Sequence, residues 1–120
     1  MRFICFFLIY VMLTVHALAG SADVEGVKVT REAVGTYRFD VTIRHQDDGW
    51  KHYANKWEVI LPSGEVIATR ILHHPHVDEQ PFTRSLSGVK IPEDIKMVKV
   101  RGHDNVHGAG HSIFEVEIIR

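Results

Sequence analysis

The stretch YRFDVTI, residues 37–43, alternates apolar and polar side chains without a break. A β-strand turns successive side chains to opposite faces, so all four apolar side chains of this stretch would lie on one face. The polar side chains between them would face solvent. The stretch therefore predicts a half-buried strand whose inward residues are Tyr37, Phe39, Val41 and Ile43.

The same alternation recurs in short runs that are bounded by turn residues. The runs are GVKVTREAV (26–34), KWEVIL (56–61), VIATRIL (66–72), FTRSLSGVKI (82–91), KMVKVRG (96–102) and SIFEVEII (112–119). In KWEVIL, Trp57 is in phase with Val59 and Leu61, so we expect it in the core. About seven short strands with a tryptophan on a central strand predict an all-β fold, an immunoglobulin-like or fibronectin-like antiparallel β-sandwich.

The first residues have the pattern of a secretory signal peptide. Arg2 precedes an apolar run over 3–15, and the small residues ALAGSA follow at 17–22. We expect residues 1–22 to be the signal, with cleavage after Ala19 or Ala22, and 23–120 to form a single domain. An uncleaved membrane anchor is the alternative. Because no cysteine follows the small residues, a lipid anchor is not expected, and the predicted location is periplasmic or secreted.

Cysteine and charge exclude several classes of function. The single cysteine, Cys5, lies inside the predicted signal, so the mature chain would have neither a disulfide nor a thiolate ligand. The formal charge of the whole chain is −1 with histidines neutral, which gives no electrostatic basis for binding nucleic acid. Nor does it favour an anionic membrane surface, so no membrane partner is expected after signal cleavage.

Histidine is the residue type that stands out, with nine in the chain and eight after the predicted signal. They concentrate in HQDDGWKH (45–52), HHPHVDEQ (73–80) and HDNVHGAGH (103–111). If consecutive strands are antiparallel, all three segments lie at the same end of the sandwich. We name this predicted end the histidine pole, and its members are His45, His52, His73, His74, His76, His103, His107 and His111.

Histidines from adjacent loops of a rigid sandwich can bind one transition-metal ion. The predicted ligands are His52, His74, His76 and His107, with His45, His103, Asp104 and His111 as secondary candidates. Nearby acids could be ligands or could orient a ligand's other ring N–H; these are Asp47, Asp48, Asp78, Glu79 and Asp104. Without thiolates, a divalent ion is expected, copper(II) or zinc first and iron after them. No catalytic residues are predicted, because no nucleophile-elbow motif such as GxSxG is present.

Three functions compete on these residues, and a purely structural role in an envelope assembly is a weaker fourth option. The first is metal carriage, buffering or sensing, which is not an enzymatic activity. The second is a metal-free binding module, in which the loops with Trp50 and Tyr53 recognise a periplasmic protein partner. The third is a redox enzyme, which rests on a resemblance. Histidines in polar loops are also common without any ligand, so each single histidine has a purely structural explanation.

The sequence resembles two known groups of proteins. GWKHYANKW (49–57), LHHPHVDEQPFTRS (72–85) and HGAG (107–110) together resemble a family of small, uncharacterised secreted bacterial proteins. This resemblance covers nearly the whole predicted mature chain, but it implies no activity.

The second resemblance is partial. HYANKWEVILPSGEV (52–66) and VRGHDNVHG (100–108) resemble superoxide reductases of the neelaredoxin and desulfoferrodoxin type. Those are immunoglobulin-like domains whose iron is held by histidines and one cysteine. Under this resemblance His52 and His107 fall on ligand histidines, and His45 lies near a third with its spacing off by one. Asp104 stands where that family has its cysteine, so the resemblance implies the fold and the pole but not the activity.

Overall fold

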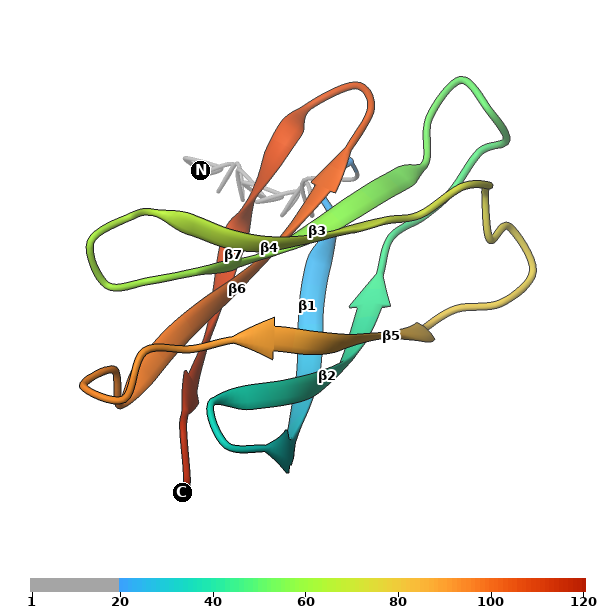
Figure 1. The fold of residues 1–120 in the computed structure, drawn as a ribbon. Coiled ribbons are helices and arrows are strands. Elements are labelled where there is room, and N and C mark those ends of the chain that lie inside the picture. The colour runs from blue at the N-terminus through green and yellow to red at the C-terminus, as the bar shows by residue number, and fades with distance from the viewer. Residues whose placement is uncertain (1–19) are drawn as a thin grey trace, which may run out of the picture.

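A computed structural model describes residues 20–120 (Figure 1). The predicted signal peptide up to residue 19, with Cys5, lies outside this range. The described strands are β1 (Asp23–Ala33), β2 (Thr36–Arg44), β3 (Ala54–Ile60), β4 (Val66–Ile71), β5 (Phe82–Lys90), β6 (Met97–Asp104) and β7 (Gly108–Glu117). The predicted all-β sandwich of about seven strands is confirmed.

The strands form two sheets in which every neighbouring pair is antiparallel. One sheet has the order β1-β2-β5 and the other has the order β4-β3-β6-β7. Figure 1 shows the two sheets lying face to face, with β3 and β6 in the middle of the larger sheet. The core is enclosed between them.

The alternation in β2 explains which face of the smaller sheet is buried. Its four apolar residues are at most 1% exposed, whereas Arg38 between them faces solvent. From the opposite sheet, β3 contributes Trp57 and Val59, both fully buried, so the prediction that Trp57 belongs to the core is confirmed. Phe82 at the start of β5 is 1% exposed and lies opposite Ile43. Burial of such aromatic and β-branched side chains is the main stabilising term for a sandwich without a disulfide.

The N-terminal strand is preceded by a packed segment. Ala22 is fully buried, and its backbone oxygen lies over two glycines of the larger sheet. A Cβ placed on Gly110 would collide with this oxygen, and one placed on Gly102 would lie 3.0 Å from it. Ala22 therefore rests directly on β6 and β7, in space that only glycine leaves free.

Glu58 is an exception to the outward-facing polar pattern of β3. It is 7% exposed because His103 and Arg101 of β6 cover it. The Nε2 of His103 and the Nη2 of Arg101 both donate to Oε1 of Glu58, the latter over 3.2 Å. Burial raises the pKa of this carboxyl, but the hydrogen bond and charge of His103, with the Arg101 bond, outweigh it and leave the pKa below its usual 4.5.

The lowered pKa of Glu58 predicts a stability contribution that depends on pH. A carboxyl with a depressed folded-state pKa stabilises the fold above its unfolded pKa and loses this contribution as pH falls through the folded value. We expect Glu58→Gln to reduce the free energy of unfolding by about 1 to 2 kcal/mol at neutral pH. The difference from wild type should shrink between about pH 5 and about pH 3. Urea denaturation across this range measures it; a difference that grows on acidification would contradict the assignment.

The close approach of Ala22 to β7 predicts that Gly110 cannot carry a side chain. We expect Gly110→Ala to lower the free energy of unfolding by about 1 to 3 kcal/mol, because backbone rather than side-chain atoms must move. Gly26→Ala is the matched control in β1, since its added Cβ would meet nothing closer than the Cβ of Thr42 at 4.0 Å. Chemical denaturation of both variants checks this. Equal stabilities would mean that Ala22 does not pack as described.

Candidate metal centre

Three loops and the segment before β1 meet at one end of the sandwich. The loops are 45–53, 72–81 and 105–107, and they appear at the upper and right-hand side of Figure 1. The strand registers account for this, since the end of β2 lies beside the start of β5, and the start of β3 lies beside the end of β6. The predicted convergence of the three histidine segments is therefore seen in the fold.

The carboxylate of Asp47 connects two of these loops. Its Oδ1 accepts from the backbone N–H of Ala54 at 3.0 Å, and its Oδ2 accepts from the backbone N–H of His76 at 2.7 Å. Oδ1 also lies 2.5 Å from Nδ1 of His45, whose side chain is fully buried. Asp47 therefore orients a histidine through its ring N–H, which is one of the two roles that the sequence predicts for an acid here.

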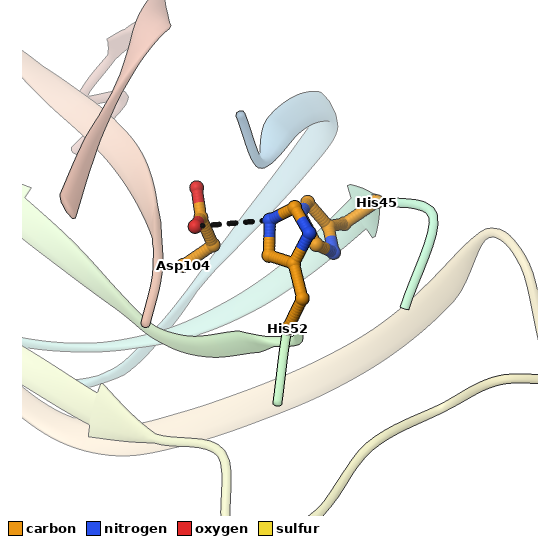
Figure 2. Close-up of side chains that lie close together, drawn as sticks. All are labelled: His45, His52 and Asp104. Carbon is orange, nitrogen blue, oxygen red and sulfur yellow. Dashed lines mark ion pairs between the residues drawn. The ribbon is translucent and has the colours of Figure 1, made fainter. Parts of the chain in front are cut away.

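His45, His52 and Asp104 form a compact cluster at this end (Figure 2). One ligand atom from each lies within 4.8 Å of the others. The Nε2 of His52 lies 3.2 Å from Oδ1 of Asp104, and the rings of His45 and His52 meet edge to face with centroids 4.8 Å apart. Two imidazoles and a carboxylate at such separations are compatible with a transition-metal ion.

Asp104 is held by the turn that follows it. Its Oδ1 accepts from the backbone N–H groups of Val106 at 2.9 Å and His107 at 2.7 Å. Burial raises the pKa of this carboxyl, but these two N–H bonds, together with the ring of His107, outweigh it and lower the pKa. Asp104 is thus held ionised at the cluster, and its buried Oδ2 has no hydrogen-bond partner among the described residues.

His107 lies beside the cluster and is more exposed than any of its three members. Its Nδ1 is 3.1 Å from Oδ1 of Asp104, and its ring centroid is 4.9 Å from that of His52. The side chain is 46% exposed. Of the four predicted ligands, His52 and His107 therefore lie at this centre, where His45 and Asp104 of the secondary set join them.

His74 and His76 form a separate pair. Their ring centroids are 4.7 Å apart, and His76 stacks on Phe82 with the planes 10° from parallel. Both ring nitrogens of His76 are buried without a hydrogen-bond partner among the described residues, and its Nδ1 is 4.0 Å from Oδ2 of Asp47. Burial, followed by the charges of Arg84 and His74, lowers its pKa. The structure thus brings this pair next to Asp47 but not into the cluster.

The remaining histidines of the predicted pole lie outside the cluster. His73 is exposed, and His111 is exposed on β7. His103 turns toward Glu58 on the outer face of the larger sheet, because it occupies a strand position rather than a loop. The cluster therefore contains fewer histidines than the predicted histidine pole.

A backbone atom that the sequence did not indicate also takes part. The carbonyl oxygen of Gly20 lies 2.8 Å from Nε2 of His45, 3.1 Å from Nε2 of His52 and 2.8 Å from Nδ1 of His107. In the sequence this glycine is only a small residue near a cleavage site, so no signal pointed to its role. A solvent-open pocket next to the cluster is lined by Gly20, Gln46, Asp47, Asp48, His52 and Val77.

Comparison with known proteins finds a relative in Halomicrobium mukohataei. This protein, described as "Putative lipoprotein", is 40% identical over 93 residues, which are 76% of this chain and 45% of that protein. The chain therefore spans less than half the length of this relative. No family model matches the chain, and no solved structure matches it. Within residues 20–120, no helix has the length and hydropathy needed to cross a membrane.

The hydrogen bonds of Asp47 predict a large effect of its removal. Asp47→Ala leaves the buried N–H groups of Ala54 and His76 without their acceptor, at about 1 to 3 kcal/mol each. We expect a total loss of about 2 to 5 kcal/mol in the free energy of unfolding, measured by urea denaturation. The neighbouring Asp48 is exposed, so Asp48→Ala should change stability by less than about 0.5 kcal/mol. Similar losses in the two variants would contradict the role given to Asp47.

Proposed function

We propose that this chain is an exported protein that binds one divalent transition-metal ion at His45, His52 and Asp104, with His107 beside them. Its role would be metal carriage, buffering or sensing. Export is supported by the signal-like residues 1–22 and by a relative described as a lipoprotein. An envelope-associated or secreted location follows from this proposal, and a periplasmic protein that donates or accepts the ion would be its partner.

The observation that carries the proposal is that two hydrogen-bond acceptors at the cluster face each other with no N–H hydrogen between them. A neutral imidazole has one N–H, and Asp47 accepts the one on Nδ1 of His45. The Nε2 of His45 then presents a lone pair, yet it lies 2.8 Å from the lone pairs of the Gly20 oxygen. An extra proton or a metal ion would relieve this repulsion. The nitrogen of His52 and the ionised carboxylate of Asp104 lie close by, so several donors could bind one ion together. This favours a metal ion over an extra proton.

The spacings between neighbouring polar atoms agree with a shared ion. Nitrogen and oxygen ligands bind at about 2.0 to 2.2 Å, so two ligands are about 3.4 Å apart around tetrahedral zinc and about 3 Å apart at the right angles of a tetragonal copper(II) site. The two ring nitrogens that approach Oδ1 of Asp104 are Nε2 of His52 at 3.2 Å and Nδ1 of His107 at 3.1 Å. The ligand atoms therefore need only small movements to surround an ion.

The donor types narrow the choice of metal. Imidazole nitrogens with one carboxylate suit zinc, copper(II), nickel and iron, whereas the absence of a thiolate from residues 20–120 disfavours copper(I). At equal availability copper(II) binds such donors most tightly, followed by nickel and zinc among the common divalent ions. Copper(II) or zinc is therefore proposed first, with iron next.

Access to the centre favours carriage over permanent storage. His45 and Asp104 are buried and fixed, while His52 borders the open pocket and His107 faces solvent. An ion held partly by exposed ligands can pass to another protein by exchanging one ligand at a time. Trp50 and Val106 are more than half exposed in the same loops and offer apolar area to such a partner.

A redox function is the second candidate, and one observation favours it. The three histidines that correspond to superoxide reductase ligands or lie near one, His45, His52 and His107, meet in space with Asp104 at the position of the cysteine. If iron is the bound ion, rapid reaction with superoxide requires the carboxylate of Asp104 to take over the role of the cysteine thiolate in superoxide reductases. Stopped-flow measurement on iron-loaded protein separates this function from carriage.

The metal proposal predicts stoichiometric binding that depends on the cluster. Mature protein purified without an affinity tag should contain, or take up, one copper or zinc ion per chain by elemental analysis. His52→Ala should weaken binding at least about tenfold in a chelator competition, because it removes a nitrogen ligand. His73→Ala is the matched control, since that histidine is exposed, and its affinity should equal wild type.

The paired substitution His74→Ala with His76→Ala tests which group of histidines binds. We expect it to change affinity less than His52→Ala does, because this pair lies outside the cluster. A folded protein that takes up no metal would reject the proposed function. The metal-free binding module would then be favoured, with the loops around Trp50 as its surface.

A further inference from the structure

The carbonyl oxygen of Gly20 lies where a ligand to the proposed ion would lie. It is 2.8 to 3.1 Å from one nitrogen of each of three histidines, His45, His52 and His107. These separations match the spacing of about 3 Å between neighbouring ligands at right angles about one ion. Among the described residues, no other backbone oxygen is within hydrogen-bond distance and geometry of more than one of these rings.

The fold fixes this carbonyl in place. Ala22, two residues further on, is fully buried, and its backbone lies against Gly102 and Gly110. At residue 20 itself, a Cβ would collide with Cε1 of His107, and φ is +155°. Glycine is therefore the residue that lets the chain pass this close to the histidines.

A lone carbonyl is a weak ligand for copper or zinc, but its own residue can strengthen it. The nitrogen of Gly20 is separated from the carbonyl oxygen by two carbons, so both atoms can bind one ion in a five-membered chelate ring. As part of a peptide bond this nitrogen has no free lone pair. As a chain terminus it is an α-amino group with an ordinary pKa near 8, which a metal ion readily displaces from its proton.

We propose that the exported protein begins at Gly20 and that Gly20 binds the ion through its terminal amine and its carbonyl, beside His45 and His52. This inference rests on the proposed metal-binding function. It selects cleavage after Ala19 over cleavage after Ala22, because the latter would remove both the buried Ala22 and the carbonyl. Metal affinity would then rise only when the signal is removed, so the protein would not compete for metal before export.

The first part of the test is the N-terminus of the exported protein. The full chain is expressed with its own signal, and the mature product is examined by N-terminal sequencing and intact mass. We expect Gly20 as the first residue. A product that begins at Asp23 would overturn the inference, whatever its metal affinity.

The second part compares two proteins that differ by one residue. One begins at Gly20, and the other keeps Ala19 ahead of it, so the carbonyl remains while the amine at Gly20 becomes a peptide nitrogen. Circular dichroism and urea denaturation confirm that both are folded. With copper(II) as the probe, chelator competition should give at least a tenfold weaker affinity for the extended chain. The electron paramagnetic resonance spectrum should also change, as expected for loss of a nitrogen ligand.

The outcomes separate this inference from the function on which it rests. If both chains bind copper(II) with equal affinity and the same spectrum, Gly20 is not an amine ligand and the inference is wrong, while the metal function stands. If neither chain binds copper(II) or zinc, the proposed function fails, and the inference fails with it. Tight binding by the chain that begins at Gly20 alone supports both.

Discussion

The buried carboxylate of Asp47 is the interaction on which the candidate site depends. A charge taken out of water is stable only when hydrogen bonds replace its hydration, and the backbone N–H groups of Ala54 and His76 do this. These bonds join the start of β3 to the loop between β4 and β5. The same carboxylate faces Nδ1 of His45 and fixes which ring nitrogen points into the cluster. Asp47 therefore both holds the loops together and orients the proposed ligand His45.

The second buried carboxylate, Asp104, works in a different way. It is held by N–H groups of its own turn, so the β6–β7 hairpin carries both the acid and His107 to the cluster. His45 and Asp104 form a rigid inner side, while His52 and His107 form an outer side that meets solvent. A fixed inner side can set the choice of metal, and a movable outer side can set the rate of exchange. This division agrees with carriage or sensing better than with a sealed structural ion.

Much of the fold could be predicted because the sequence repeats a simple physical pattern. The alternation in residues 37–43 determines which side of β2 is buried, and the phase of Trp57 places it in the core. The end at which the loops gather follows from antiparallel order alone. The edge strand β7 is less regular, since Phe114 is only partly buried and Ile118 is buried beyond the end of the strand. An edge strand has fewer neighbours, so its pattern is weaker.

The site could be predicted only in part. The sequence indicates His52 and His107, and it includes His45 and Asp104 as secondary candidates. It cannot show that His103 faces Glu58, because that depends on its exact register in β6. It also cannot show that His76 stacks on Phe82, or that Gly20 approaches three rings, since these contacts arise from the packing of loops far apart in the chain. Sequence patterns indicate which face of a strand is buried and at which end of the sandwich a loop lies. They do not indicate which side chains come into contact there.

Anomalous diffraction from crystals of the mature protein grown with copper(II) or zinc tests the proposed metal centre most directly. We predict one strong peak within bonding distance of the Nε2 atoms of His45 and His52 and of a carboxylate oxygen of Asp104. A peak between His74 and His76 instead, or no ordered peak at the cluster in metal-loaded crystals, would contradict the assignment of the metal to this cluster.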